Sequence, residues 1–128
     1  MIKYLLDTHV ILWILDGKGQ FSDTTFRIIT DPGNVKYVSI ASAWEVAIKI
    51  GKGNLQLEGG VSGFLRTVNR HGIKLLPIKR KHIKTLETLP LLHRDPFDRI
   101  LVASAMAEGM SLITADENIP RYDVASLW

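Results

Sequence analysis

The sequence contains no cysteine among its 128 residues. That absence excludes a disulfide framework and a zinc site built on thiolates, and it is typical of a protein kept in a reducing cytoplasm. Long hydrophobic runs are also missing, because the uncharged stretch at residues 10–15 is far too short to cross a bilayer. We therefore expect a cytoplasmic protein without disulfide bonds and without a membrane segment.

A strong excess of one charge is missing as well. Sixteen Lys and Arg residues face thirteen Asp and Glu residues, which gives a formal net charge of +3. This balance is compatible with a nucleic-acid partner but is not evidence for one. Repeats, low-complexity tracts and linkers are not evident, and 46% of the residues are hydrophobic. We therefore expect one domain over residues 1–128 with a core of its own.

Short apolar strands alternate with amphipathic helices along the chain. Strands are expected at residues 4–6, 35–40, 73–78, 112–114 and 124–128, and helices at 9–15, from 22, from 42, 61–70, 81–89 and 96–108. Because no tight two-residue hairpin joins the strands, the pattern favours a parallel sheet with helices on both faces. Right-handed crossovers then place the carboxyl ends of the strands at one edge, where ligands bind in such sheets.

Four acidic residues are predicted to converge at that edge. Asp7 directly follows the first strand, and Asp116 follows the fourth strand by two residues. Glu45 is expected in the first turn of the helix after the second strand. Asp98 is expected in the first turn of the helix that feeds the fourth strand, and this helix start returns to the same edge.

A cluster of carboxylates is costly without a cation, because like charges at close range raise one another's pKa. Carboxylate oxygens without Cys or His ligands select hard ions such as Mg²⁺ or Mn²⁺. A hard ion held in this way can activate water against a phosphodiester. The pattern therefore predicts metal-dependent phosphoryl hydrolysis, and it leaves open whether one or two ions bind.

Each acid also has a purely structural interpretation. Glu45 stands three residues after Ser42, which is the spacing of a capping box. Asp98 occupies a helix start, where the helix dipole favours an acid. Asp7 and Asp116 are both suitable as caps of the segments that follow them. Capping explains each residue singly, but it does not explain why all of them fall at one edge of the sheet.

Four blocks of the sequence resemble those of the PIN-domain nucleases, and among these the VapC-like toxins of type II toxin–antitoxin pairs. The resemblance covers essentially the whole chain. The blocks are LLDTH at residues 5–9, SIASAWEVAIK at 39–49, LPLLHRDPFDRIL at 89–101 and LITAD at 112–116.

This resemblance implies a three-layer α/β/α sandwich with a mostly parallel central sheet. It implies an endoribonuclease that depends on Mg²⁺ or Mn²⁺ and acts as the toxin of a pair. It also implies a homodimer, which a cognate antitoxin neutralises by covering the active groove. The acidic residues of the family correspond to Asp7, Glu45, Asp98 and Asp116, which are the expected metal ligands and catalytic residues.

The resemblance further implies supporting positions around the acids. Thr8 and Thr114 match residues that often support the site, whereas His9 stands where many relatives carry Asn and its role is open. Lys49, one helical turn after Glu45, is expected to pair with it or to contact a phosphate. With Arg99, it is our candidate for contact with substrate or antitoxin.

Two other groups of residues are predicted from the pattern alone. A basic run is either one solvated helix face or a surface for RNA phosphates, and the solvated face is the commoner case; the run consists of Lys79, Arg80, Lys81, His82 and Lys84. Trp13, Trp44 and Trp128 are expected in the core or at a dimer interface, and Phe26 on the buried side of its helix.

Three other functions compete with the nuclease interpretation. A phosphoacceptor receiver domain also gathers acids at a sheet edge, but it needs a late Lys after a strand, and Lys79 is a poor candidate. A haloacid-dehalogenase-like phosphatase needs a second Asp two residues after Asp7, where His9 stands. A non-catalytic PIN-like module that binds RNA or protein is the main alternative, and the complete set of acids argues against it.

Overall fold

A five-stranded sheet in the order β3-β2-β1-β4-β5 forms the centre of the molecule, and all of its neighbouring strands are parallel. The structure is a computed structural model that describes residues 2–17 and 19–128. The strands are β1 (Lys3–Leu6), β2 (Val35–Ser39), β3 (Lys74–Leu76), β4 (Ser111–Ile113) and β5 (Ser126–Leu127). The parallel arrangement confirms the sequence prediction, and every described strand pair follows it.

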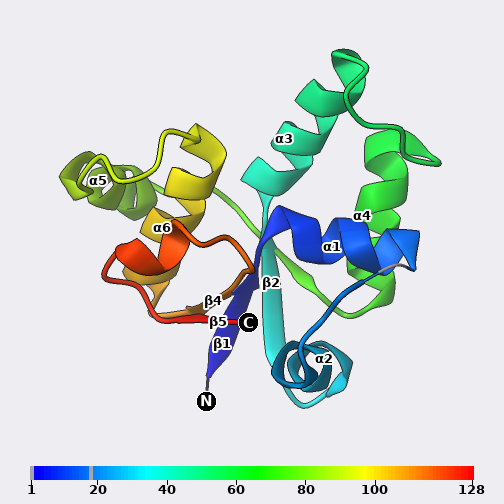
Figure 1. The fold of residues 1–128 in the computed structure, drawn as a ribbon, viewed down its shortest axis with the longest axis horizontal. Helices are drawn as coiled ribbons and strands as arrows, with labels where there is room; N and C mark the ends of the chain where they lie inside the picture. Colours follow the sequence, from blue (N-terminus) through cyan, green and yellow to red (C-terminus); the bar gives the residue numbers. More distant parts are fainter. Residues whose placement is uncertain (1, 18) are drawn as a thin grey trace.

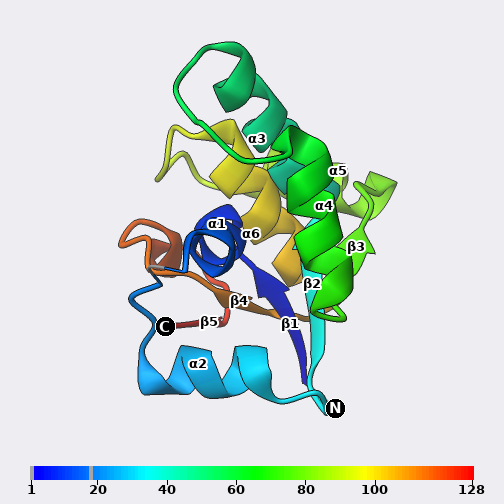
Figure 2. The same ribbon diagram turned by 90° about the vertical axis from the view of Figure 1, so that its right-hand side faces the viewer.

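Helices cover both faces of this sheet, as Figure 1 shows. They are α1 (Thr8–Asp16), α2 (Asp23–Thr30), α3 (Ile40–Gly51), α4 (Gly60–Arg70), α5 (Arg80–Thr88), α6 (Pro96–Glu108) and the short η1 (Ile119–Arg121). In Figure 1, α5 and α6 lie on one side of the sheet and α1 and α4 on the other. Figure 2 shows α2 at the end of the molecule away from α3. The chain is thus an α/β/α sandwich.

The central strand β1 contributes one side chain to each of two cores. Leu5 belongs to the core under α6, together with Leu112 and Leu101, whereas Leu6 belongs to the core under α1 and α4. Successive residues of a strand point to opposite faces of the sheet. Because helices cover both faces, the side chains of Leu5 and Leu6 are both fully buried. The strand that ends at Leu6 is therefore fixed from both sides, which gives Asp7, the residue that follows it, a defined place.

Helix α3 begins earlier than the sequence predicts. Ser39 is its N-cap and accepts a hydrogen bond from the backbone N–H of Ala41, so the helix starts at Ile40 and not after Ser42. Glu45 consequently lies in the second turn of the helix, not in the first. The predicted capping box between Ser42 and Glu45 is wrong, and it no longer accounts for this acid.

Helix α6 has the ends that its sequence predicts. Asp95 caps it through hydrogen bonds from the N–H groups of Phe97 and Asp98, Pro96 occupies the first turn, and Gly109 ends it with φ 67°. Because the helix feeds β4, its first turn returns to the carboxyl edge of the sheet. Asp98 is brought to that edge in this way.

Two predicted core positions are on the surface instead. The side chain of Phe26 is 57% exposed and that of Trp44 58% exposed, whereas Ile28 and Ile29 fill the buried side of α2. Placing Phe26 in the core was therefore wrong, as was the core option for Trp44. Trp13 and Trp128 are half-buried, and they pack edge to face with ring centroids 5.3 Å apart.

No helix in residues 2–17 and 19–128 combines the length and the apolar character that crossing a membrane requires.

Candidate active site

Asp7 stands at the carboxyl end of the central strand and begins the site. Its backbone N–H still donates to the carbonyl of Ile113, so the residue is held in the sheet. The hydroxyl of Thr114 donates to its Oδ2 at 2.8 Å. Although Asp7 is the N-cap of α1, its side chain makes no capping hydrogen bond. Capping therefore does not explain why a carboxylate is buried here.

Two buried carboxylate oxygens lack a partner among the described residues. They are Oδ1 of Asp7 and Oε1 of Glu45, and both residues are only 4% exposed. A buried polar atom without a hydrogen bond is costly, because it loses the water that would otherwise solvate it. The other oxygen of Glu45, Oε2, is paired with the ammonium group of Lys49 at 3.1 Å, so one of the two carboxylate oxygens has a partner and Oε1 has none among the described residues.

Asp98 and Asp116 reach the same place from α6 and from the segment after β4. The Nε2 atom of His93 lies 3.0 Å from Oδ2 of Asp98 and 3.3 Å from Oδ2 of Asp116. Oδ1 of Asp116 accepts a hydrogen bond from the N–H of Asn118, which makes a local turn. Oδ1 of Asp116 therefore accepts a hydrogen bond within its own loop, and Oδ2 faces His93 and Asp98.

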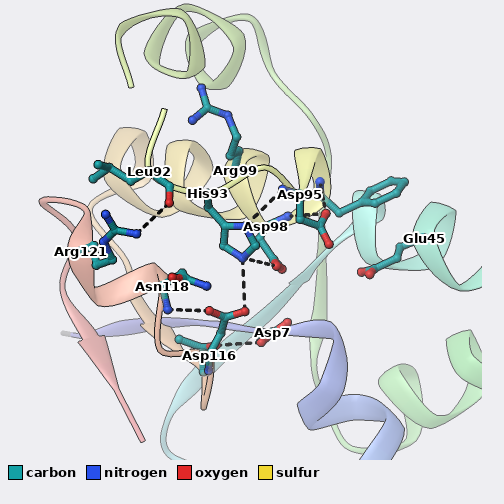
Figure 3. A network of polar contacts seen from close by, with 12 residues as sticks. Asp7, Glu45, Leu92, His93, Asp95, Asp98, Arg99, Asp116, Asn118 and Arg121 are labelled. Carbon is teal, nitrogen blue, oxygen red and sulfur yellow. Dashed lines mark hydrogen bonds and ion pairs between the residues drawn. The ribbon is translucent and has the colours of Figure 1, made fainter. Parts of the chain in front are cut away.

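Figure 3 shows the arrangement of these side chains, with Asp7, Asp98 and Asp116 gathered around His93 and Glu45 approaching from α3. His93, Asp98 and Asp116 each offer a ligand atom within 4.8 Å of the others, a spacing at which they could hold a metal ion. No sequence motif marked His93 as a site residue. Its only signal in the sequence is its position five residues before Asp98.

The electrostatics of the site are those of crowded acids that are buried or half-buried. Burial, and then the charges of Asp7, Asp95 and Asp116, raise the pKa of Asp98 to about 7, although His93 acts in the opposite direction. Burial also raises the pKa of Asp7, against the hydrogen bond from Thr114. An acid in the first turn of a helix normally has a lowered pKa. The helix dipole therefore does not account for Asp98, because burial and repulsion from neighbouring carboxylates raise its pKa by more than the dipole lowers it.

The residues present fit a hard divalent cation. Buried Asp7 and Glu45 and half-buried Asp98 and Asp116 lie at one edge (Figure 3), two of their oxygens have no partner among the described residues, and burial and neighbouring charges raise the pKa of one carboxyl group. Each of these features is unfavourable in the metal-free protein and is relieved by a cation. Oxygen donors dominate the set, which is the preference of Mg²⁺ and Mn²⁺.

The predicted supporting residues lie beside the acids. Thr114 contacts Asp7 directly, and its hydroxyl also accepts the N–H of Asp116 at 3.0 Å. Thr8 instead donates to the hydroxyl of Ser42 at 2.8 Å, which ties α1 to α3. His9 is exposed on α1, close enough to Asp7 to lower its pKa through charge.

The two predicted basic contacts differ in their surroundings. Lys49 pairs with Glu45, as its spacing predicted. The Nη1 atom of Arg99 donates instead to the carbonyl of Pro90 and to the hydroxyl of Tyr122, both at 2.9 Å. Arg99 thereby fastens the loop that carries His93.

The basic run at residues 79–84 has a structural role that neither of its predicted interpretations included. Lys79, Lys81 and His82 all contact the carboxylate of Glu108, at distances of 2.7–3.1 Å. His82 is completely buried. These contacts join the start of α5 to the end of α6.

Comparison with known proteins identifies the family. The sequence model of the PIN domain matches residues 4–125, so the chain belongs to the PIN domain family. A search of curated proteins finds no match.

Solved structures share the fold at low sequence identity. A chain of VapBC2 from Rickettsia felis, bound to a DNA fragment from its promoter, has a TM-score of 0.76 at 16% identity, with 99% of this chain and 98% of that chain covered. DNA-bound VapBC from Salmonella typhimurium gives 0.66 at 15% identity, with coverage of 99% and 98%. A toxin–antitoxin complex from Klebsiella pneumoniae gives 0.57 at 17% identity, with coverage of 89% and 87%.

Proposed function

We propose that this protein is a metal-dependent endoribonuclease that hydrolyses RNA phosphodiester bonds and acts as the toxin of a toxin–antitoxin pair. Membership of the PIN domain family and the fold shared with a toxin–antitoxin complex support this proposal. The observation that carries it is the pair of buried oxygens without a partner in the described part of the chain, Oδ1 of Asp7 and Oε1 of Glu45, beside Asp98 and Asp116. A structural set of acids has no reason to leave them unsatisfied.

Asp7, Glu45, Asp98 and Asp116 are the proposed metal ligands, and Mg²⁺ or Mn²⁺ is the proposed cofactor. When bound, such an ion lowers the pKa of a water molecule and offsets negative charge on the phosphate. The protein supplies the positions of the ligands. Thr114 orients Asp7 so that Oδ1 is the free oxygen, and the Asp95 cap fixes the first turn that carries Asp98.

A basic cavity beside the acids is the proposed place for the RNA chain. It has a volume of about 400 Å³, and Lys49, Lys52 and Arg94 line it together with Glu45 and Asp95. Cations next to a metal site suit the phosphates that flank the bond to be cut. Lys49 is accordingly proposed as a phosphate contact. Arg99 is proposed as a contact with substrate or antitoxin through the guanidinium nitrogens other than Nη1.

An antitoxin and a second copy of the chain are the proposed protein partners, in the cytoplasm. Several large apolar side chains are exposed near the site, including Trp44 at 58% and Leu91 at 79%. The ring of Trp44 packs edge to face on Phe97, with centroids 5.1 Å apart, so it is held in place on the surface. Exposed apolar groups of this kind favour a protein interface.

The proposal is tested by RNA cleavage with Mg²⁺ or Mn²⁺ and with EDTA. We expect cleavage only with metal, and a loss of at least about a hundredfold in Asp98→Asn and Asp7→Asn, because each removes a charged ligand. Asp23→Asn is the matched control, since this acid lies at the start of α2, away from the cluster. Equal cleavage by wild type and Asp98→Asn, or cleavage that survives EDTA, contradicts the proposal.

A further inference from the structure

The imidazole of His93 lies between two of the proposed metal ligands. Its Nε2 atom is 3.0 Å from Oδ2 of Asp98 and 3.3 Å from Oδ2 of Asp116, and Figure 3 shows both contacts. The side chain is only 15% exposed. A single ring nitrogen therefore contacts the two carboxylate oxygens that a shared cation would use.

The other ring nitrogen determines where the proton of His93 is. The backbone N–H of Asp95 donates to Nδ1 of His93 at 3.2 Å. A backbone N–H can only donate, so Nδ1 carries a lone pair, and the proton of the neutral imidazole is on Nε2. Nε2–H therefore donates a hydrogen bond to Oδ2 of Asp116, and Oδ2 of Asp98 lies 3.0 Å from the same nitrogen. A nitrogen that carries this proton has no lone pair for a metal.

The backbone around His93 is fixed by contacts that have no part in the acid cluster. The hydroxyl of Tyr122 accepts hydrogen bonds from the N–H groups of Leu92 and His93, at 3.1 and 2.9 Å. Arg99 donates to the same hydroxyl, and Tyr122 itself is 4% exposed. The loop thus presents the imidazole to the two carboxylates in a defined place.

We propose that His93 is a positioning residue that bridges Asp98 and Asp116 in the metal-free protein and competes with the cation for these two carboxylates. This inference depends on the proposed function, because it assumes that Asp98 and Asp116 hold a metal. The bridge offers partial compensation to acids that otherwise only repel one another. A cation that uses both Oδ2 atoms must displace Nε2–H from them, so His93 weakens metal binding.

The test is a Mn²⁺ titration of the whole protein at pH 8, in which electron paramagnetic resonance measures free Mn²⁺. We expect His93→Ala to lower the Kd for Mn²⁺ about tenfold, which corresponds to about 1.4 kcal/mol. His93→Gln retains an N–H donor, so its Kd is expected between those of wild type and His93→Ala. His71→Ala is the matched control, since this histidine lies between α4 and β3, outside the acid cluster. The Kd of the His71→Ala protein for Mn²⁺ is expected to equal that of wild type.

The sign of the effect decides between roles. A higher Kd in His93→Ala overturns the proposal and makes His93 a nitrogen ligand, and an unchanged Kd overturns it by showing no competition. A wild-type protein that binds no Mn²⁺ contradicts the proposed function itself. A second measurement needs no variant: long-range ¹H–¹⁵N spectra of metal-free wild type are expected to show the His93 proton on Nε2. A proton on Nδ1 overturns the proposal.

Discussion

The hydroxyl of Thr114 donates a hydrogen bond to Oδ2 of Asp7 at 2.8 Å, between residues that are 107 positions apart in the chain. The two residues follow the neighbouring parallel strands β1 and β4, whose register pairs Leu6 with Ile113. The bond leaves Oδ1 as the oxygen of Asp7 without a partner among the described residues. The position of the oxygen without a partner is thus set by a neutral side chain just after the neighbouring strand.

Removing this hydroxyl is the first test of that relationship. Thr114→Val keeps the shape of the side chain but leaves Oδ2 of Asp7 unsatisfied, so we expect the free energy of unfolding to fall by about 1 to 2 kcal/mol. We also expect cleavage and Mn²⁺ affinity to fall about tenfold, because Asp7 can then rotate. Thr114→Ser restores the hydroxyl donor and is expected to recover most of the stability, the cleavage and the Mn²⁺ affinity. Failure of Thr114→Ser to recover them would show that the hydroxyl is not responsible.

Metal binding is expected to stabilise the folded protein. The acids meet only in the folded chain, so Mn²⁺ at 100 times its Kd should raise the free energy of unfolding by about 2.7 kcal/mol. Thermal unfolding with Mn²⁺ and with EDTA measures this effect, and Asp7→Asn is expected to abolish it. A shift that persists in Asp7→Asn but not in Asp98→Asn would remove Asp7 from the ligand set.

The stability of the metal-free protein is expected to depend on pH through Asp98. Its pKa is raised to about 7 in the folded state, chiefly by burial, against about 3.9 for an unfolded chain. The folded state therefore holds this proton more tightly, and the contribution is favourable at low pH and lost as pH rises from about 4 to 7.

Urea unfolding in EDTA at pH 5 and pH 8 measures this dependence. We expect Asp98 to lower the free energy of unfolding by about 2 kcal/mol over this interval. Asp98→Asn is expected to reduce the difference between the two pH values and to be more stable than wild type at pH 8. Parallel pH profiles of wild type and Asp98→Asn would rule out this role.

The contacts of Glu108 with Lys79, Lys81 and His82, which join α5 to α6, give a pH dependence of stability with the opposite sign. Partial burial opposes ionisation of Glu108, but hydrogen bonds from His82, Lys79 and Lys81 outweigh it and lower the pKa of Glu108 to about 2. The folded state therefore favours the charged form. Its contribution is present above the unfolded pKa of about 4.3 and is lost as pH falls from there to about 2.

Glu108→Gln is expected to lower the free energy of unfolding at pH 7 by about 1 to 2 kcal/mol, because the buried His82 loses a charged acceptor. Glu87→Gln, an exposed position on α5, is the matched control and is expected to change stability by less than about 0.5 kcal/mol. RNA cleavage by Glu108→Gln should stay near wild type where the protein is folded. A stability loss equal to that of Glu87→Gln would mean that the contacts of Glu108 contribute nothing to the free energy of unfolding.

Parts of the site were predictable because they follow from strand order alone. Asp7 and Asp116 follow apolar segments that read as strands, and parallel strands bring their carboxyl ends to one edge. Asp98 was predictable from its cap, because Asp95-Pro96 indicates a helix start. These inferences need only local patterns and the handedness of the crossovers.

Other features depend on contacts that a local pattern does not encode. Ser39 and Ser42 are both suitable helix caps by type, and the choice depends on where β2 leaves the sheet. His93 lies in a loop, and its direction is set by Tyr122, 29 positions later. Trp44 belongs by composition in a core, yet it is 58% exposed on α3, which projects beyond the sheet in Figure 1. Tertiary packing decided each of these cases.

The place of β1 in the middle of the sheet has a consequence for synthesis of the chain. Asp7 leaves the ribosome 107 residues before its partner Thr114, and the acid at position 116 follows later still. Until β4 docks beside β1, the cluster lacks Thr114 and Asp116. A nascent or truncated chain that ends before β4 therefore has no assembled acid cluster, so the proposed nuclease activity would begin only after β4 and Asp116 have been synthesised.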